Sequence, residues 1–390
     1  MGEMEKIAPD GFVHRCQCTS RDALKKIQID PPSKEYYAAA KKYLDSIAKP
    51  LDSLGEFEHI ISRCGAMMRT ATPRFDDKAM IVMIGDNGVV AEGISQSGQD
   101  VTKAVAFSMG RRGSSVCKMA AASGARVLPV DIGINDPDPV PGVFECKVVQ
   151  GTKDFLKEPA MTEAEVMQAL ITGIELAKWC AEEGVTMLGT GEMGIGNTTT
   201  SCAVVSALLG CAPSSIVGRG AGASDAMLAR KQEVIEQAML KYGFLTEEEV
   251  RGGAGPEAGK RHAENVDAFE ILRCVGGLDI AGMAGVFIGG AMSHIPVVID
   301  GVISGAAALI AEMLVPGTKD YALASHIGSE PALKVILEKL GLKAVIDAKM
   351  ALGEGTGAAL FFTMIDTVMT VASSAASFEE IAVEQYTRFT

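Results

Sequence analysis

The stretch "GVTMLGTGEMGIGNTTTSCAVVSALLG", residues 184–210, decides the fold that this sequence adopts. The apolar run "VTMLGT" at 185–190 predicts a strand, and "SCAVVSALLG" at 201–210 predicts a buried helix. A glycine-rich corner between a strand and a helix exposes backbone N–H groups at the helix N-terminus, where the helix dipole also favours negative charge. We therefore expect "GEMGIGNTTT", Gly191 to Thr200, to bind an anion.

Two known phosphate-binding motifs almost match this corner. Gly189-x-Gly191-x-x-Gly194 resembles a dinucleotide fingerprint, which needs an acidic residue about twenty positions later, but the next one is Asp225. That departure disfavours a nicotinamide-dependent oxidoreductase. The Walker-type frame that starts at Gly191 has Asn197 where a lysine belongs, which disfavours a nucleoside triphosphate with magnesium.

A single phosphate monoester remains the predicted ligand of this corner. The backbone amides, the helix dipole and the hydroxyls of Thr198 to Thr200 would hold it. Glu192 would be repelled by a phosphate, so we expect it to face a sugar hydroxyl or the sheet.

Outward from this corner, short β-branched runs alternate with longer helical patterns. This alternation predicts an α/β fold with a mostly parallel, Rossmann-like sheet that carries helices on both faces. The predicted strands are 79–85, 126–132, 185–190, 296–301 and 321–325, and two clear helices are 162–183 and 225–241. Residues 1–75 and 350–390 are predicted to form a small helical lobe, and residues 76–349 a large α/β domain.

Polar or glycine-rich segments follow the predicted strands. They are "GDNG" (85–88), "DIGIN" (131–135), the Gly191–Thr200 corner and "DGVISG" (300–305). Asp and Gly favour turns in any protein, so one such segment carries little information. Because the carboxyl ends of parallel strands share one edge of a sheet, together they predict a ligand site there.

Composition excludes several classes of protein. The chain has 390 residues, 48% hydrophobic and 22% charged, and a formal charge of −13, which disfavours nucleic acid or an anionic membrane as a partner. Its beginning lacks the basic and apolar parts of a signal peptide. The apolar run 280–299 contains glycines and Pro296, and it predicts a buried helix followed by a strand.

The cysteines indicate a cytoplasmic protein. Nine of them are scattered without a regular framework, as expected of reduced thiols. Cys16 and Cys18 lie near His14, but no second pair of ligands follows at zinc spacing, so no metal site is expected.

Two further glycine clusters contain candidate functional residues. "GRGAG" (218–222) precedes the helix of Lys231, which from sequence alone is better interpreted as a solvated helical lysine than as an anion ligand. "LGEGTGAA" (352–359) places Glu354 between glycines, before a strongly apolar helix. Glu354 could be a general base, with a pKa raised by the apolar surroundings, or a carboxylate that is stabilised by a helix N-terminus.

These motifs occur in an order that resembles a known family. The quoted motifs are "KPLDSLGEFE" (49–58), "GDNGVVAEGIS" (85–95), "GTKDFLKEPAMT" (151–162), "GEMGIGNTTT", "GRGAG", "GGLDIAGMAG" (276–285), "VIDGVIS" (298–304), "ASH" (324–326) and "LGEGTGAAL" (352–360). Residues 45–375 resemble the nicotinate-nucleotide:dimethylbenzimidazole phosphoribosyltransferases of cobamide lower-ligand synthesis.

The resemblance implies a reaction and a site. Nicotinate mononucleotide and an aromatic base would give the α-ribotide 5′-phosphate of the base and nicotinate, with no metal or cofactor. Glu354 would be the catalytic base. The implied nucleotide and phosphate ligands are Gly191, Glu192, Met193, Gly194, Ile195, Gly196, Asn197, Thr198, Gly218, Arg219, Gly220, Lys231, Asp300 and Ser325; the implied base ligands are Asp86, Ser95, Gln99 and Leu352.

The sequence departs from the family pattern at several positions. Asn87 replaces a histidine, and Gln96, Ser97 and Gly98 replace Ala, an aromatic residue and Pro in the segment that lines the base pocket. A second histidine is also missing from "SHIGSEPAL" (325–333). These changes leave the aromatic base open between a benzimidazole and a phenol or p-cresol.

They also leave the assembly of the chain open. The chain is expected to form a homodimer or a heterodimer with a paralogous chain. One alternative is a subunit of a phenol-using heterodimeric enzyme, and a more remote alternative is a nicotinamide-dependent oxidoreductase.

Overall fold

The fold is organised around a parallel sheet whose strand order places the glycine-rich corner at its centre. The computed structural model describes residues 20–220, 222–252 and 266–387, so His14, Cys16 and Cys18 lie outside the described residues. The strands are β1 (Lys78–Gly85), β2 (Arg126–Gly133), β3 (Phe144–Glu145), β4 (Met187–Met193), β5 (Val297–Ile299) and β6 (Ala322–Ala324). They form one six-stranded, all-parallel sheet in the order β3-β2-β1-β4-β5-β6.

This order has a switch point between β1 and β4, because the chain continues outward from β1 to β2 and then returns to the other side with β4. Ligands of open α/β sheets bind at such points, outside the carboxyl ends of the strands. The predicted α/β class and parallel sheet are confirmed. The strand of the corner is longer than expected, since β4 continues through Gly191 and Glu192 to Met193, and the sequence did not reveal β3.

Alternate residues of β1 face opposite sides of the sheet, and each side belongs to a separate hydrophobic core. Ala79, Ile81 and Met83 face one core; Met80 and Val82 face the other. The helices of the first core are α6 (Glu163–Glu182), α7 (Asn197–Leu209), α9 (Asp225–Lys241), α12 (Ala268–Val275), α13 (Leu278–Met292), α14 (Val302–Leu314) and α15 (Pro331–Leu340). The helices of the second are α2 (Lys34–Asp45), α3 (Glu56–Met68), α4 (Asp100–Gly110), α5 (Ser115–Ala122) and α16 (Thr356–Ser374).

Short helices complete the described chain. They are α1 (Arg21–Leu24), η3 (Gly88–Glu92), α8 (Pro213–Ile216), α10 (Glu247–Val250) and η4 (Thr318–Tyr321). The boundaries of the long helices follow local signals. Thr162 and Glu165 form a capping box that begins α6, which satisfies two backbone N–H groups at its first turn.

Glycines let α6 and α13 cross with their backbones in contact. A Cβ on Gly173 would lie 1.9 Å from the carbonyl oxygen of Gly282, and one on Gly285 would lie 2.1 Å from that of Leu170. The predicted buried helix and strand within 280–299 are confirmed as α13 and β5. The motif "GGLDIAGMAG" therefore has a packing role as well as a place near the site.

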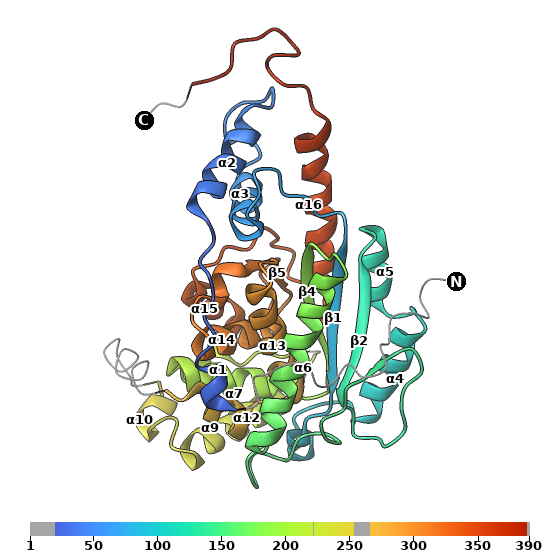
Figure 1. Cartoon of the computed structure of the whole chain (residues 1–390). Coiled ribbons are helices and arrows are strands. Elements are labelled where there is room, and N and C mark those ends of the chain that lie inside the picture. Colours follow the sequence, from blue (N-terminus) through green and yellow to red (C-terminus); the bar gives the residue numbers. More distant parts are fainter. Residues whose placement is uncertain (1–19, 221, 253–265, 388–390) are drawn as a thin grey trace.

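Helices from the first and from the last part of the described chain meet beyond the sheet. In Figure 1, α2 and α3 lie beside α16 at one end of the molecule. The Tyr43 hydroxyl donates to the Ala372 carbonyl oxygen, and the Ala48 amide donates to the Ala376 carbonyl oxygen at 2.9 Å. Leu44 and Ile60 share the second core with Met80 and Phe361, so these helices continue the core of the sheet. The division at residues 75 and 350 stays a prediction.

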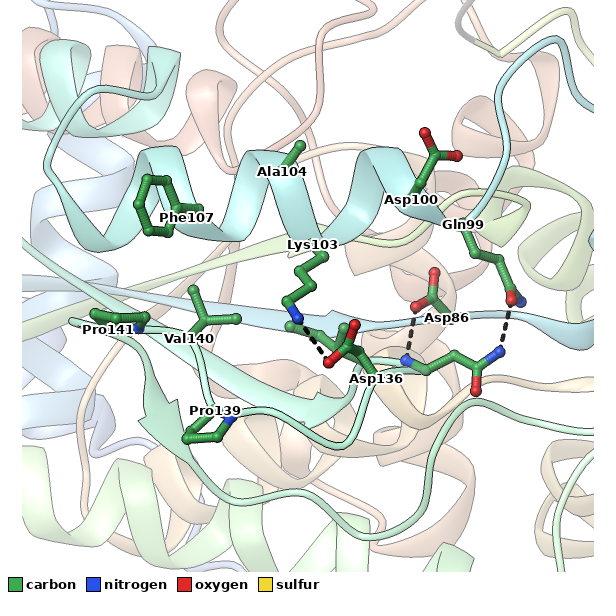
Figure 2. A pocket seen from close by; sticks show the side chains of 12 residues that line it. Asp86, Gln99, Asp100, Lys103, Ala104, Phe107, Asp136, Pro139, Val140 and Pro141 are labelled. Atoms are coloured by element: carbon green, nitrogen blue, oxygen red, sulfur yellow. Dashed lines mark hydrogen bonds and ion pairs between the residues drawn. The ribbon is translucent and has the colours of Figure 1, made fainter.

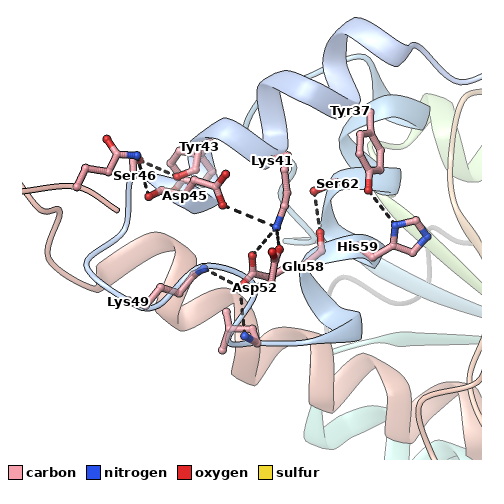
Figure 3. A network of polar contacts seen from close by, with 12 residues as sticks. Tyr37, Lys41, Tyr43, Asp45, Ser46, Lys49, Asp52, Glu58, His59 and Ser62 are labelled. Carbon is pink, nitrogen blue, oxygen red and sulfur yellow. Dashed lines mark hydrogen bonds and ion pairs between the residues drawn. The ribbon is translucent and has the colours of Figure 1, made fainter. Parts of the chain in front are cut away.

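Figure 3 shows a polar network in this helical region. The Glu58 side chain is 1% exposed, and its oxygens accept hydrogen bonds from Lys41 at 2.8 Å and Lys49 at 2.6 Å. Burial alone would raise the pKa of Glu58, but these lysines and the Leu54 amide hold it below its usual value. The motif at 49–58 thus forms the connection between α2 and α3.

Among the described residues, one helix is long and apolar enough to span a membrane, and its first half packs inside the protein. That helix is α16, and 44% of its tested window is buried. It also carries Asp366, which pairs with Lys78 at 2.9 Å. The cysteines that the structure describes are all free thiols, most of them buried.

Candidate active site

The glycine-rich corner lies against the end of β1, at the switch point of the sheet. A Cβ on Gly194 would be 2.2 Å from the Gly85 carbonyl oxygen. Gly196 has a φ of +94° and forms the N-cap of α7, a conformation that side chains other than glycine rarely adopt. The local sequence therefore requires glycines where β4 turns into α7.

Several backbone amides of the corner already have partners within the protein. The Ile195 amide donates to the Thr102 hydroxyl at 3.2 Å, and the Thr199 amide donates to the Gly196 carbonyl oxygen at 2.9 Å. The Thr198 hydroxyl accepts a hydrogen bond from Lys231 Nζ at 3.0 Å. The side of the corner that faces Lys231 is therefore better suited to an anion than the Ile195 side.

Lys231 is buried, which differs from the solvated helical lysine favoured on sequence alone. Its exposed fraction is 5%. Burial lowers the pKa of Lys231, while the neighbouring Cys202 and Glu330 oppose that effect. A buried cation beside a helix N-terminus is a strong ligand for a phosphate. Arg219, by contrast, points away and bonds to Asp225 and to the Ala223 carbonyl oxygen.

Glu354 lies in a strained loop that rests directly on β4. Gly353, Glu354 and Gly355 have φ angles of +82°, +61° and +100°. A Cβ on Gly191 would be 2.2 Å from the Glu354 carbonyl oxygen, so the loop and the strand touch through their backbones. A left-handed conformation costs a residue such as glutamate about 1–3 kcal/mol, and such strain concentrates at functional sites.

The Glu354 carboxylate reaches the N-terminus of a neighbouring helix. Its Oε2 accepts a hydrogen bond from the Val116 amide, in the first turn of α5, at 3.1 Å. The sequence left open whether this carboxylate was a base or a helix-terminal group. The structure shows a carboxylate at a helix N-terminus, that of α5 and not of the helix that follows Glu354, and the residue also lines a cavity. Its role as a base stays a prediction.

A cavity of about 320 Å³ brings the glycine-rich motifs together. The predicted site residues that line it are Glu192, Met193, Gly194, Ile195, Asn197, Thr198, Gly220, Asp300, Leu352 and Glu354. Further lining residues include Ser97, Val101, Val105, His326, Glu330 and Met350. Its volume is in the range of small-molecule sites.

Two buried carboxylates share one amide group beside this cavity. The Asn197 Nδ2 donates to Glu192, and to Asp279 at 3.0 Å. Burial raises the pKa of Glu192 to about 8, against hydrogen bonds from Asn197 and the Glu354 backbone. Burial likewise raises the pKa of Asp279 to about 6. Burial and the neighbouring Asp279 and Asp300 thus favour the protonated form of Glu192.

Asp300 holds the start of α16 in place. Its Oδ1 accepts from the Gly357 amide at 2.7 Å and its Oδ2 from the Gly355 amide at 3.2 Å. Burial raises the pKa of Asp300, although these amides and His326 oppose the effect. Ser325 is fully buried behind it, with its hydroxyl donating to the Asp300 carbonyl oxygen at 3.0 Å.

A second cavity, of about 690 Å³, contains two of the predicted base ligands. Figure 2 shows Asp86 and Gln99 there, beside the side of α4 that carries Lys103 and Phe107. The Gln99 Oε1 accepts from Asn135 Nδ2 at 2.8 Å, and the Asn135 amide donates to Asp86 at 2.8 Å. The structure therefore does not bring Asp86 and Gln99 into the cavity of Glu354.

The remaining predicted residues do not line either cavity. Gly191 and Gly196 shape the corner, Gly218 contacts Glu330, and Ser95 accepts a hydrogen bond from the Ser97 amide at 3.2 Å. Sequence reasoning assigned no role to Asp279, His326 or Glu330. All three residues lie in motifs that the sequence analysis quoted. Asp279 lies in "GGLDIAGMAG", and His326 and Glu330 follow β6 in "SHIGSEPAL". In the described part of the chain, no group of three acidic, histidine or cysteine residues is arranged to hold a metal.

Comparisons with known proteins agree with this geometry. A family model described as a phosphoribosyltransferase matches residues 29–383. A nicotinate-nucleotide–dimethylbenzimidazole phosphoribosyltransferase of Acetivibrio thermocellus is 39% identical over 90% of this chain and 95% of its own length. One from Clostridium perfringens is also 39% identical, over 87% of this chain and 89% of its own. The crystal structure of CobT from Thermus thermophilus superposes with a TM-score of 0.80 at 33% identity, covering 90% of this chain and 100% of that chain.

The fold and the family model thus define an enzyme of the phosphoribosyltransferase class, whose candidate site lies at the switch point of a parallel sheet. The chain belongs to the nicotinate-nucleotide–dimethylbenzimidazole phosphoribosyltransferase family. The resemblance found in the sequence is confirmed, and the oxidoreductase alternative is wrong despite the strand order that dinucleotide-binding folds share.

Proposed function

We propose that this chain transfers the 5-phosphoribosyl group of nicotinate mononucleotide to an aromatic base, in the pathway that builds a cobamide lower ligand. The observation that carries the proposal is the position of Glu354, in a strained loop facing the same cavity as Thr198 and Gly220. The names of its relatives contain both substrates, nicotinate nucleotide and dimethylbenzimidazole.

The proposed chemistry begins with the phosphate. The phosphate binds on the side of the corner formed by Thr198, Gly220 and Lys231. This contact fixes the ribose within the cavity that Glu354 also lines. Holding both substrates in line supplies a large share of the rate, because the reaction then proceeds within one complex.

The group transfer itself needs one base. The acceptor nitrogen or hydroxyl of the aromatic base attacks the anomeric carbon from the face opposite nicotinate. The glycosidic C–N bond breaks, its electron pair stays on nicotinate as a neutral ring nitrogen, and the acceptor proton passes to Glu354. The pyridinium is already a good leaving group, so no acid or metal is included in this scheme.

Ser97 and Leu352 bear on the choice of aromatic base. Both line the cavity, and Ser97 stands where the family pattern has an aromatic residue. A serine side chain in this wall cannot stack on a two-ring base. We therefore expect the enzyme to be less selective among aromatic bases, with phenol and p-cresol as candidate acceptors. Asp86 and Gln99 lie in the second cavity, and Gln99 connects to the corner through the carbonyl oxygen of Asn87, which accepts from its Nε2 at 3.2 Å.

The assembly is proposed to be a dimer, in the cytoplasm. Free, buried cysteines suit a reducing compartment. A heterodimer with a paralogous chain is the second candidate, and the observation that favours it is the joint replacement of the family's histidine and aromatic residue by Asn87 and Ser97.

The test is nicotinate release by the purified chain. The protein is incubated with nicotinate mononucleotide and, separately, dimethylbenzimidazole, phenol and p-cresol, and nicotinate and ribotide are quantified by chromatography. Equal amounts of both products support the proposal. No release with any base from the chain alone, but release after a paralogous chain is added, would support the heterodimer instead.

A further inference from the structure

Gly218 and Gly220 of the "GRGAG" motif, which are expected to bind the phosphate, instead contact a carboxylate of the chain itself. Glu330 Oε1 accepts a hydrogen bond from the Gly220 amide at 2.8 Å. Its Oε2 is buried and has no hydrogen-bond partner among the described residues. A Cβ on Gly218 would lie 2.2 Å from Oε2, so the carboxylate rests on the backbone of the segment.

The surroundings of this carboxylate are those of an anion site. The Cβ position of Gly220 is 2.9 Å from Thr198 Oγ1 and 3.2 Å from Lys231 Nζ. Lys231 is buried, and among the described residues its hydrogen bond goes to the uncharged Thr198 hydroxyl at 3.0 Å. A buried ammonium without a contacting carboxylate is favourable only if an anion comes to it.

The side chain of Glu330 is not held by its own helix, whereas the preceding loop is fixed by hydrogen bonds from the Ile327 and Ser329 amides to the Ile346 and Met350 carbonyl oxygens. Glu330 is the N-cap of α15, and its side chain makes no N-cap hydrogen bond there, so the helix does not hold the carboxylate. Ile327 and Ser329 of the preceding loop are exposed. The contact of Oε1 with Gly220 is thus a contact between two loops.

We propose that Glu330 is an internal competitor for the phosphate of the nucleotide, an inference that rests on the proposed function. In the free enzyme the Glu330 carboxylate accepts the hydrogen bond of the Gly220 amide, next to Lys231. A phosphate monoester brings nearly two negative charges and three acceptor oxygens to the same corner. Carboxylate and phosphate repel each other at this distance, so the Glu330 side chain leaves when the nucleotide binds.

This competition determines how tightly the enzyme holds any phosphoribosyl compound. Both the substrate and the ribotide product carry the 5′-phosphate, so binding the phosphate too tightly would slow product release. Glu330 returns to Gly220 as the product leaves, and so lowers the affinity for both equally. Its effect falls on binding and leaves the chemical step to Glu354.

The experiment compares Glu330→Gln with Glu338→Gln, which removes the same charge from an exposed position on the same helix. Ribose 5-phosphate is the probe, because its binding does not depend on the aromatic base or on turnover. Calorimetry should show about tenfold tighter binding to Glu330→Gln and unchanged binding to Glu338→Gln. Equal or weaker binding by Glu330→Gln would overturn the proposal, weaker binding meaning that Glu330 contacts the sugar.

A second measurement tests the proposal without the variant, in case Glu330→Gln does not fold. In a crystal of the wild-type chain with ribose 5-phosphate, Glu330 should have left the Gly220 amide, and a retained hydrogen bond would overturn the proposal. Failure of the proposed function looks different. In that case the wild-type chain releases no nicotinate with any base or partner, whatever the calorimetry shows.

Discussion

Two buried glutamates, Glu58 in the helical region and Glu192 at the carboxyl edge of the sheet, lie in opposite electrostatic surroundings. Glu58 is held by two lysines, which keep its pKa low. Glu192 forms no ion pair in the described part of the chain, and its neighbours Asp279 and Asp300 are also acidic. The fold therefore neutralises a buried carboxylate by a cation where it holds helices together, and by a proton beside the candidate active site.

The difference teaches which group serves stability and which serves function. An ion pair that fixes one geometry suits the connection between α2 and α3, which needs only to persist. Groups with shifted pKa values cluster at active sites, because chemistry near neutral pH needs them there. The comparison can be tested by substitutions in both regions.

The largest expected effect is on catalysis, from Glu354→Gln at the carboxyl edge. Glutamine keeps an acceptor for the Val116 amide but cannot take a proton, so kcat should fall by about 10²–10⁴-fold. That corresponds to roughly 3–5 kcal/mol of transition-state stabilisation. Steady-state assays should show this loss while calorimetry shows unchanged nucleotide binding. Near-full turnover at neutral pH would mean that another group is the base.

The second effect is on stability, from Glu58→Gln in the helical region. Removing this charge leaves Lys41 and Lys49 beside an uncharged group and should lower the free energy of unfolding by about 2–3 kcal/mol in urea titrations. The matched control is Glu56→Gln on the same helix, whose partner Lys343 is exposed and which should change stability by less than about 1 kcal/mol. Activity per folded molecule should stay the same in both variants. Equal losses from both would contradict the contrast.

The third effect is a pH dependence with opposite signs in the two regions. Folded Glu192 keeps its proton up to about pH 8, whereas the unfolded chain releases it near 4.5. The folded state thus binds more protons in that window, so the free energy of unfolding falls as pH rises, by at most about 1.4 kcal/mol per pH unit for this group. Asp279 adds the same trend between its ordinary pKa of 3.8 and about 6.

Glu58 behaves in the reverse way, because its folded pKa lies below the unfolded value. Its contribution is present above the unfolded pKa and is lost as pH falls through the folded pKa. Chemical denaturation of the wild type and Glu192→Gln at pH 5, 6, 7 and 8 checks the first trend, and the variant should show a clearly shallower slope. A slope identical to that of the wild type would show that Glu192 does not keep its proton.

The smallest expected effect concerns the choice of aromatic base. Ser97→Tyr returns an aromatic ring to the cavity wall, and one stacking contact is worth about 0.5–1.5 kcal/mol. The ratio of kcat/KM for dimethylbenzimidazole to that for phenol should rise about two- to tenfold. Gln96→Tyr, at the exposed neighbouring position, is the control and should leave the ratio unchanged. If Ser97→Tyr leaves the ratio unchanged, residue 97 does not contribute to the choice of aromatic base.

Local patterns in the sequence were enough to predict the sheet and the meeting of the glycine-rich motifs. Strand periodicity located β1 and β2, and the glycines at 191, 194 and 196 marked the corner because only a residue without a side chain fits there. The glycines on both sides of Glu354 predicted that the backbone could approach a ligand closely, and this stays a prediction; what the structure shows is that the loop touches Gly191 of β4. The functional roles of these residues stay predictions.

What the sequence could not predict depends on packing between distant segments. Whether Lys231 is solvated or buried depends on how α9 rests on α7, and nothing within α9 itself determines that. Gln99 faces the second cavity because Asn135, from the loop after β2, binds it. Glu330 was overlooked because its partner, the Gly220 amide, is 110 positions away in the chain.

The late position of α16 in the sequence also affects the order in which the protein can be made. Met80, in β1, packs against Gly355 at the start of this helix, and Gly189 of β4 lies against Met80 and Phe362. A ribosome reaches these partners only after about nine-tenths of the 390 residues have been joined. Until then, the part of the second core that α16 covers stays exposed beside α5, and such exposed apolar surface is prone to aggregate. We therefore expect nascent chains that end before Thr356 to remain protease-sensitive and chaperone-bound, and chains that extend past Ser374 to become resistant.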